Sequence, residues 1–332
     1  MLSISVIVLA HNAEKCIGRA IASALNQSLE PSQIIVVDYG STDGTRAIVK
    51  NMGRKVKYIQ QDKSGPAVAR NHGIEESSGE WIAFLDADDE WFPNWVSTHT
   101  RVLNNHLECM WSCCNFECAG DVSQHNMIVN ETSSYEGAVN YFDALLRGIR
   151  LQTSDFMINR SMLDETGMFR YEMESGQDMD LWSRIAMRCP LIAYSSDVCY
   201  RYWQDNVNSI TKINRTRDVQ VKGVLENILL AKSLGQEAVA SYYPYARKRT
   251  VDYILRASAK DIQLGRETLD KAKRTFPLTL SERAQAGMLK ALPAHISKRL
   301  VGWIVDCFPS GRKWHKPVRI STRGNHEYKS GP

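Results

Sequence analysis

The stretch that decides the fold is Ile82-Ala83-Phe84-Leu85-Asp86-Ala87-Asp88-Asp89, in which an apolar run ends in three carboxylates. Parallel strands covered on both faces have continuous hydrophobic sequences, so this run predicts a buried strand. Ligands of open α/β sheets bind beyond the carboxyl ends of such strands. Three carboxylates there repel one another unless a cation joins them, which favours a divalent metal shared with substrate phosphates. The alternative is an acidic turn that caps the following helix.

Strand and helix patterns alternate upstream of this stretch. Apolar runs at 4–9, 34–37 and 56–59 predict strands, and residues 17–25 repeat with helical spacing. A second helix is expected after the second strand, with Ser41 or Asp43 as its N-cap, and a third opens at Gly65-Pro66 and carries Arg70. This alternation predicts the α/β class, with a mostly parallel sheet flanked by helices on both faces.

The turn after the first strand excludes two common nucleotide sites. It reads Ala10-His11-Asn12-Ala13 and contains neither the G-x-G-x-x-G of dinucleotide-binding folds nor a P-loop. Phosphates must therefore be held without a glycine-rich cradle, and the carboxylates at 86–89 with a metal would serve.

The composition excludes other classes of protein. The chain has 332 residues and a net charge of +4, too mild to indicate nucleic acid as a partner. No run of eighteen apolar residues and no secretory signal is seen, so a cytoplasmic protein with reduced thiols is expected. Zinc is an alternative for the cysteines at 109–118, but paired C-x-x-C units are absent and core-filling thiols are favoured.

The second half of the chain begins with a helix from Pro93 to about 105 and a cysteine-rich strand. Residues 120–136 are polar and predict a surface loop, and 156–158 predict a further strand. An amphipathic helix then opens with Gln177-Asp178-Met179-Asp180, where the acids could simply complement the helix dipole. Residues 191–202 read as extended, and from about 215 the periodicity is helical.

Several of these motifs occur in the order found in one known family. The set comprises residues 5–8 with Asn12, then 36–43 around Asp38, the Ala69-Arg70-Asn71 triplet, 85–89, and Gln177-Asp178. Together they resemble family 2 glycosyltransferases, inverting enzymes of GT-A fold that use nucleotide sugars. The resemblance spans roughly residues 3 to 210 and does not include the helical C-terminal third.

The resemblance implies a role for each matching residue. Asp38 would accept a hydrogen bond from the nucleobase, Arg70 would hold the base or its diphosphate, and Asp86 would contact the ribose. Asp88 would ligate Mn²⁺ or Mg²⁺ on the diphosphate, and Asp178 would be the general base. The remaining donor-binding positions are Ala10, Asn12, Gly40 and Ala87.

Three departures from the family pattern bear on these roles. Tyr39 stands where most relatives carry a second acid, so nucleobase contacts differ here. Gln177 replaces the usual Glu of the Glu-Asp pair, and because an amide cannot act as a base, Asp178 is favoured, with Asp180 close by. The Gln-x-x-Arg-Trp motif of processive synthases is absent, which favours the addition of a single sugar.

The predicted organisation is a GT-A catalytic domain at 1–213, a helical region at 214–309 and a basic, flexible tail at 310–332. The expected partners are a nucleotide-sugar donor, preferably a UDP-sugar, and a saccharide or lipid-linked saccharide acceptor used in surface polysaccharide or glycolipid synthesis. An apolar helical face with basic flanks at 294–323 predicts peripheral membrane contact, and packing on the catalytic domain is the alternative.

Two other functions compete with glycosyl transfer. A sugar nucleotidyltransferase shares a similar sheet but needs a glycine-rich basic loop after the first strand, which residues 10–15 do not form. A nucleotide-sugar-binding protein without catalysis would have lost one of the acids, whereas Asp86, Asp88 and Asp178 are all present.

Overall fold

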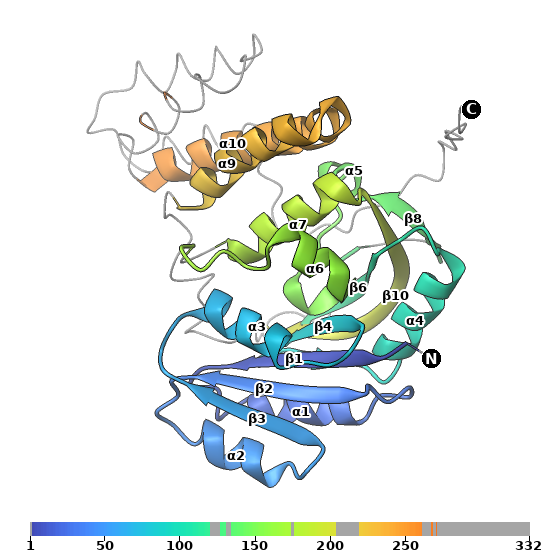
Figure 1. Ribbon diagram of the computed structural model, residues 1–332, viewed down its shortest axis with the longest axis vertical. Helices are drawn as coiled ribbons and strands as arrows, with labels where there is room; N and C mark the ends of the chain where they lie inside the picture. Colours follow the sequence, from blue (N-terminus) through green and yellow to red (C-terminus); the bar gives the residue numbers. More distant parts are fainter. Residues whose placement is uncertain are drawn as a thin grey trace.

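The computed structural model describes residues 2–119, 127–130, 134–173, 176–203 and 219–260, together with Glu267 and Asp270. The first half alternates strands with helices as the sequence predicts (Figure 1). Its elements are β1 (Ile4–Ala10), α1 (Ile17–Leu25), β2 (Gln33–Tyr39), α2 (Thr45–Asn51), β3 (Val56–Gln61), α3 (Pro66–Glu75), β4 (Trp81–Asp86), β5 (Glu90–Trp91) and α4 (Trp95–Asn105).

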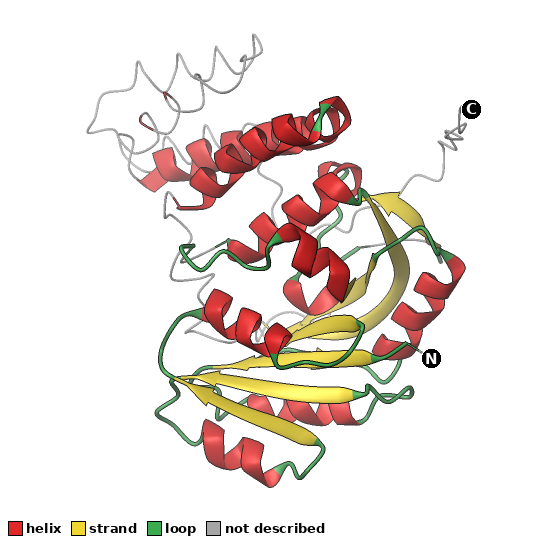
Figure 2. Ribbon diagram, viewed as in Figure 1, coloured by secondary structure: helices red, strands yellow, loops and turns green. Residues whose placement is uncertain are grey.

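The second half supplies short connecting elements, one long strand and the C-terminal helices (Figure 2). They are β6 (Trp111–Ala119), β7 (Met127–Ile128), β8 (Glu136–Asn140), α5 (Tyr141–Leu146), the 3₁₀ turn η1 (Thr153–Asp155), β9 (Met157–Asn159), α6 (Arg160–Thr166), α7 (Gln177–Arg188), β10 (Leu191–Trp203), α9 (Val219–Leu234) and α10 (Gln236–Lys260).

All the strands of the described segments join one mixed sheet in the order β3-β2-β1-β4-β9-β6-β10-β5, with β7 beside β6 and β8 beside β10. The four strands from β3 to β4 run parallel, whereas β9 is antiparallel to both β4 and β6. The predicted α/β class with a mostly parallel sheet is therefore confirmed.

Successive residues of the parallel strands pack against different layers of helices, because strand side chains alternate between the two faces. In β1, Val6 and Val8 join a core with α1, α2 and α4. Ile7 and Leu9 join the opposite core, which includes α3, α6 and α7. Both faces being covered explains why β1, β2 and β4 read as unbroken apolar runs.

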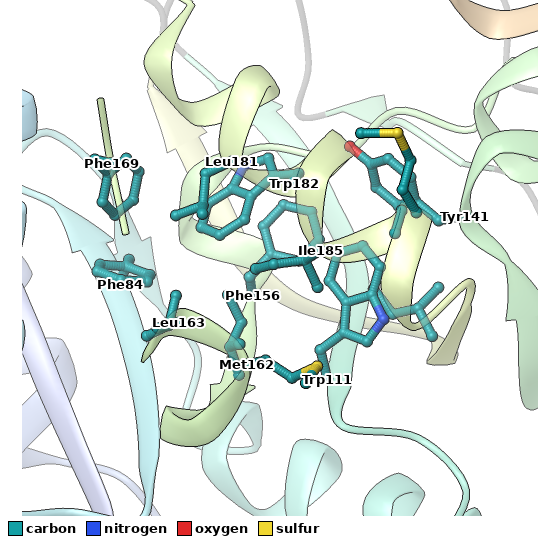
Figure 3. Packing of buried hydrophobic residues seen from close by; sticks show 14 of the residues in the cluster. Phe84, Trp111, Tyr141, Phe156, Met162, Leu163, Phe169, Leu181, Trp182 and Ile185 are labelled. Atoms are coloured by element: carbon teal, nitrogen blue, oxygen red, sulfur yellow. The ribbon is translucent and has the colours of Figure 1, made fainter. Parts of the chain in front are cut away.

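An aromatic cluster holds α7 against the sheet (Figure 3). The Trp182 ring lies 5.9 Å from Phe84 of β4, 5.6 Å from Phe169 and 4.6 Å from Phe156, measured between centroids. Each of these side chains is at most 1% exposed. Aromatic packing of this kind contributes beyond its buried area, so the start of α7 is fixed relative to β4.

The C-terminal helices pack on the same core. Phe142 of α5 contacts Tyr242 and Tyr245 of α10, with ring centroids 5.3 and 5.2 Å apart. Asn227 of α9 donates to the Asp180 carboxylate of α7 at 3.0 Å. The helical character expected beyond 215 is present at 219–260, and the boundaries proposed at 213 and 309 stay predictions. Among the described helices, none combines the length and hydropathy needed to cross a membrane.

Two regions differ from the sequence-based expectation or lie outside the described residues. The prediction of a surface loop over 120–136 is wrong at 127–130, where β7 pairs with β6 and Asn130 is fully buried. Asn130 can be buried because its amide donates to the Arg150 carbonyl and its backbone NH bonds Asn115. The predicted membrane segment at 294–323 and the tail at 310–332 lie outside the described residues.

A buried histidine on α4 gives the fold a pH dependence. The His99 ring packs on Trp95 in a tilted arrangement with centroids 3.8 Å apart, its Nδ1 lies 2.8 Å from the Ser112 hydroxyl, and burial lowers its pKa to about 3. Unfolded histidine takes up a proton below about pH 6.5 whereas folded His99 stays neutral, so stability contributed by this residue is present above pH 6.5 and falls with decreasing pH.

We predict that His99 lowers the free energy of unfolding by about 2 kcal/mol between pH 7 and pH 5. Urea titrations of the wild type and His99→Phe at both pH values measure this, because the phenyl ring keeps the stack but cannot bind a proton. His106→Gln, at a partly exposed histidine, is the control. Equal pH dependence of His99→Phe and the wild type contradicts the prediction.

Candidate functional site

The strand register brings the predicted donor residues to one edge of the sheet. Ala10 at the end of β1 pairs with Asp38 of β2, and Leu9 pairs with Asp86 of β4. The carboxyl ends of these parallel strands lie side by side, which is where open α/β sheets bind ligands. Ala10, Asp38 and Asp86 are thus brought together as predicted, and their roles in donor binding stay predictions.

The loops after β1 and β2 are tied to each other. The Asn12 backbone NH donates to the Ser41 hydroxyl at 2.9 Å, and the Asn12 amide oxygen accepts from the Thr42 backbone NH at 2.9 Å. The prediction that Ser41 or Asp43 caps a helix as N-cap is wrong, because α2 begins at Thr45 with Gly44 at that position. Ser41 is engaged across the two loops instead.

Asp38 is almost completely buried at 1% exposure. One carboxylate oxygen accepts from the Ser41 backbone NH at 2.9 Å and the other from the Tyr58 hydroxyl at 2.8 Å. Burial and this bond raise the pKa of Tyr58. Tyr58 is a site residue that the sequence pattern did not single out, because only the β2–β3 register places it beside Asp38.

Tyr39 is stacked on His11 with ring centroids 5.0 Å apart. Burial raises the pKa of its phenol, which therefore stays neutral. The next residue, Gly40, has a φ of 87°, and a Cβ at this position would lie 3.0 Å from Lys63. Both constraints favour glycine at this position. Gly40 therefore allows the backbone conformation of this loop, and its role in donor binding stays a prediction.

Arg70 forms an ion pair with Asp86. Its guanidinium donates to the Asp86 carboxylate at 2.8 Å and lies 5.4 Å from the Phe169 ring centroid. Arg70 is 7% exposed as a residue, whereas the Asp86 side chain is 34% exposed. The pair therefore keeps a partly accessible carboxylate oriented at the edge of the sheet.

The three carboxylates at and just after the end of β4 have different surroundings. Asp88 is partly exposed, and its backbone carbonyl accepts from Arg19 at 2.8 Å. Asp89 is buried and accepts from the Ser154 hydroxyl at 2.6 Å. Burial, followed by the charges of Asp88 and Asp86, raises the pKa of Asp89 well above its ordinary value. Ala87, between Asp86 and Asp88, packs against the core that contains residues of α1 and α4.

The fit of a divalent cation can be tested on these donors. Within the part of the chain that the structure describes, no three His, Cys, Asp or Glu side chains gather in a way that could hold a metal. A cage made of protein ligands alone is thus not present there. A single partly exposed carboxylate, Asp88, suits an ion whose other ligands are water and substrate phosphates, as Mg²⁺ usually has.

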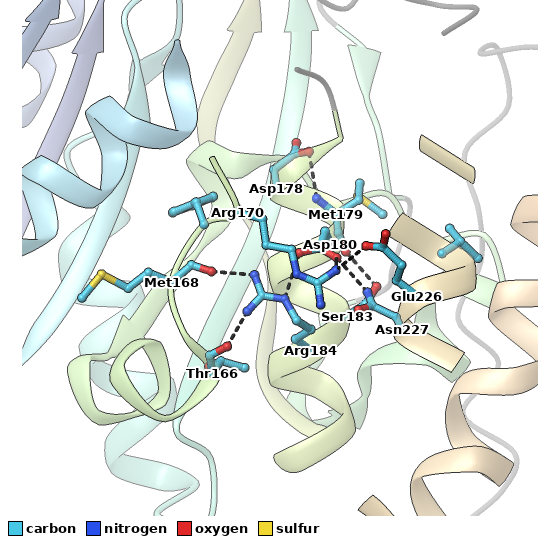
Figure 4. Close-up of polar contacts among 12 residues, drawn as sticks. Thr166, Met168, Arg170, Asp178, Met179, Asp180, Ser183, Arg184, Glu226 and Asn227 are labelled. Atoms are coloured by element: carbon cyan, nitrogen blue, oxygen red, sulfur yellow. Dashed lines mark hydrogen bonds and ion pairs between the residues drawn. The ribbon is translucent and has the colours of Figure 1, made fainter. Parts of the chain in front are cut away.

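The start of α7 separates two neighbouring acids (Figure 4). Asp178 is partly exposed, and its oxygens accept from the Met179 backbone NH at 2.8 Å and from the Thr153 hydroxyl at 3.4 Å. Asp180 is 4% exposed and bonds Arg184 at 2.8 Å. Its other partners are Arg170 at 3.1 Å and Asn227 at 3.0 Å.

Of these two acids, only Asp178 is therefore accessible from solvent. Asp180 is enclosed by two guanidinium groups and an amide, whereas Asp178 retains exposure at the positive end of the helix dipole. Gln177, the departure from the family pattern, is buried at 6% exposure. The catalytic role of Asp178 stays a prediction.

A mixed, mostly parallel sheet with aspartates at its carboxyl edge and an acid at the start of α7 defines a GT-A-like fold. The fold is similar to that of S. aureus TarS 1–349, solved in complex with UDP-GlcNAc, with a TM-score of 0.62 and 17% identity over 80% of this chain and 83% of that one. Residues 5–165 match the family described as Glycosyl transferase family 2.

The sequence is also similar to those of known and putative glycosyltransferases. A putative teichuronic acid biosynthesis glycosyltransferase, TuaG of Bacillus subtilis, is 30% identical over 63% of this chain and 81% of its own length. A GalNAc(5)-diNAcBac-PP-undecaprenol beta-1,3-glucosyltransferase of Campylobacter jejuni is 28% identical over 74% of this chain and 82% of its own. An uncharacterized glycosyltransferase of Rickettsia bellii is longer, and the match spans 26% of it. The chain belongs to glycosyl transferase family 2.

The enclosure of Asp180 generates a prediction about stability. Asp180→Asn leaves the buried Arg184 without its carboxylate, whereas Arg170 keeps its ion pair with Glu226 at 3.2 Å, so we expect the free energy of unfolding to fall by about 2–4 kcal/mol. Asp178→Asn should cost much less because, within the described residues, the Asp178 carboxylate is bonded by a hydroxyl and a backbone NH rather than by a cation.

Urea unfolding of both variants and of Asp164→Asn, at an exposed acid of α6, provides the comparison. A loss for Asp180→Asn no greater than for Asp164→Asn would show that the enclosed acid is not structural.

Proposed function

We propose that this chain is an inverting glycosyltransferase that transfers one sugar from a UDP-sugar to an acceptor hydroxyl, in the synthesis of a bacterial surface glycan. The observation that carries the proposal is a continuous set of contacts at one edge of the sheet. The Arg70–Asp86 pair is joined through Ser154 and Thr153 to the partly exposed Asp178. This series of contacts supports the proposal that the donor-binding groups and the base share one site.

The donor end of the site is assigned by chemistry. Asp38 keeps lone pairs beyond its two internal hydrogen bonds and can accept from a nucleobase NH, while Asp86 can accept from ribose hydroxyls. Arg70 supplies a positive charge that is paired with Asp86. The UDP-sugar assignment rests on the donor named in the TarS complex and on these groups.

A divalent cation, when bound, would act as a Lewis acid on the departing diphosphate. Asp88 is the residue that would hold it, with Mn²⁺ or Mg²⁺ as the candidates, and Asp86 beside it stays oriented by Arg70. Keeping the metal on a single carboxylate leaves its remaining positions for the phosphates.

The reaction then requires a base on the acceptor side. The acceptor oxygen bonds to the anomeric carbon as the bond from that carbon to the diphosphate breaks, and the hydroxyl proton passes to Asp178. One displacement from the opposite face inverts the anomeric configuration. The acceptor is a glycan hydroxyl, and a lipid-linked saccharide like the one named for the Campylobacter relative would suit the membrane contact predicted for 294–323.

The metal assignment is tested with Asp88→Ala. A panel of UDP-, GDP- and dTDP-sugars is scanned for thermal stabilisation with Mn²⁺ or with chelator, since ligands that bind the folded state raise its apparent stability. We expect UDP-sugars to stabilise the wild type in the presence of Mn²⁺, and Asp88→Ala to lose the metal-dependent part. Asp164→Ala is the control, and equal metal-dependent stabilisation of Asp88→Ala and the wild type would refute the role of Asp88.

The base assignment is tested with Asp178→Asn, which keeps the shape of the side chain and removes its basicity. We predict near-normal donor stabilisation and transfer slowed by about 10²–10⁴-fold, the usual contribution of a general base. UDP release from UDP-glucose or UDP-N-acetylglucosamine, with Mn²⁺ and p-nitrophenyl glycosides as acceptors, measures the rate. Wild-type transfer by Asp178→Asn would remove Asp178 from the mechanism, and absence of any transfer by the wild type would favour a binding protein.

A further inference from the structure

The turn η1 joins the two ends of the site. Its residues Thr153, Ser154 and Asp155 are 5%, 0% and 0% exposed. The turn lies between the carboxylates that follow β4 and the start of α7, and it contacts both. No sequence motif marks it, and the roles assigned above to donor, metal and base do not include it.

Ser154 fixes the turn to the end of β4. Its hydroxyl donates to Asp89 at 2.6 Å and accepts from the Asp86 backbone NH at 3.1 Å. Its backbone carbonyl accepts from the indole NH groups of Trp91 and Trp95, each at 3.1 Å. Because the bonds converge on one buried residue from several directions, the turn cannot shift without breaking more than one of them.

The turn is also closed on itself. The Asp155 carboxylate accepts from the Gln152 backbone NH at 2.5 Å, and the Asp155 backbone NH donates to the Gln152 carbonyl at 3.1 Å. Together these two bonds close the turn between its first and last residues. The backbone of Thr153, which lies inside the closed turn, is therefore held at a set position relative to Asp86 and Asp89.

Thr153 links the turn to the candidate base Asp178 through a hydrogen bond. Its hydroxyl donates to one Asp178 oxygen at 3.4 Å, while the other oxygen accepts from the Met179 backbone NH at 2.8 Å. The first distance is long for a hydroxyl bond. Hydrogen bonds of catalytic groups are often long without substrate and shorten in the complex.

Building on the proposed function, we propose that Thr153 is a positioning residue that orients the Asp178 carboxylate, and that Ser154 sets its position relative to the donor carboxylates. Thr153 itself touches neither reactant. In this proposal, two buried residues of one short turn, Thr153 and Ser154, set the distance between the donor carboxylates and the base. A misplaced reacting group can slow an enzyme by about 100-fold even when it is displaced by only 1 Å.

The experiment compares Thr153→Val, which removes the hydroxyl and keeps the shape, with Thr153→Ser, which keeps the hydroxyl. UDP release is measured from UDP-glucose and UDP-N-acetylglucosamine with Mn²⁺ and p-nitrophenyl glycosides. We expect Thr153→Val to lower kcat by about 10–100-fold with KM for the donor unchanged, and Thr153→Ser to restore most of the loss. Thr250→Val, at an equally buried threonine of α10, is the control and should keep the wild-type kcat.

A double variant shows whether Thr153 acts through Asp178. If it does, Thr153→Val adds nothing to Asp178→Asn, since coupled residues give non-additive effects. Wild-type kcat in Thr153→Val, or full additivity with Asp178→Asn, overturns the inference. Should Thr153→Val not fold, Thr153→Ala replaces it in the same comparisons.

The same data separate failure of the inference from failure of the proposed function. Slow transfer by Asp178→Asn together with normal transfer by Thr153→Val refutes only the role of Thr153. Normal transfer by Asp178→Asn refutes the base assignment itself, and with it the inference.

Discussion

Repulsion among the three carboxylates at Asp86, Asp88 and Asp89 is the constraint to which the rest of the site responds. Each of the three has a different environment: Asp86 is paired with a guanidinium, Asp89 is buried with a raised pKa and accepts from a hydroxyl, and Asp88 is partly exposed with its backbone carbonyl bonded by Arg19. These unlike environments separate the three charges, and they keep Asp86 and Asp88 partly exposed at the edge of the sheet while Asp89 is enclosed.

The alternation of strand-like and helix-like segments made much of this architecture predictable. Unbroken runs in β1, β2 and β4 require coverage on both faces, and parallel strands place Asp38 and Asp86 at one edge. The helical spacing of α7 also separates Asp178 from Asp180, because residues two apart point to different sides of a helix. The sequence pattern carries these features because they depend on local periodicity.

The features that sequence reasoning missed depend on contacts between distant segments. Ser154 gains its importance only when η1 lies against β4, and Tyr58 only when β3 pairs with β2. Asn130 is polar and reads as loop, yet it is buried because an amide network with Asn115 satisfies it. A turn signal was present in Thr153-Ser154-Asp155, since these residue types favour turns, but no local rule indicates what such a turn contacts.

The position of β10 has a consequence for how the chain folds. This strand pairs with β6, β5 and β8, all of them far upstream, whereas a single helix joins β1 to its neighbour β2 and β2 to its neighbour β3. Topologies with distant pairings form slowly, because the intervening chain must be closed into a loop first. We therefore expect the side of the sheet formed by β1, β2 and β3 to form ahead of the side formed by β6 and β10 during synthesis. Until β10 arrives, β6 presents an unpaired edge to other chains, so chains that stop short of Leu191 should be prone to aggregation.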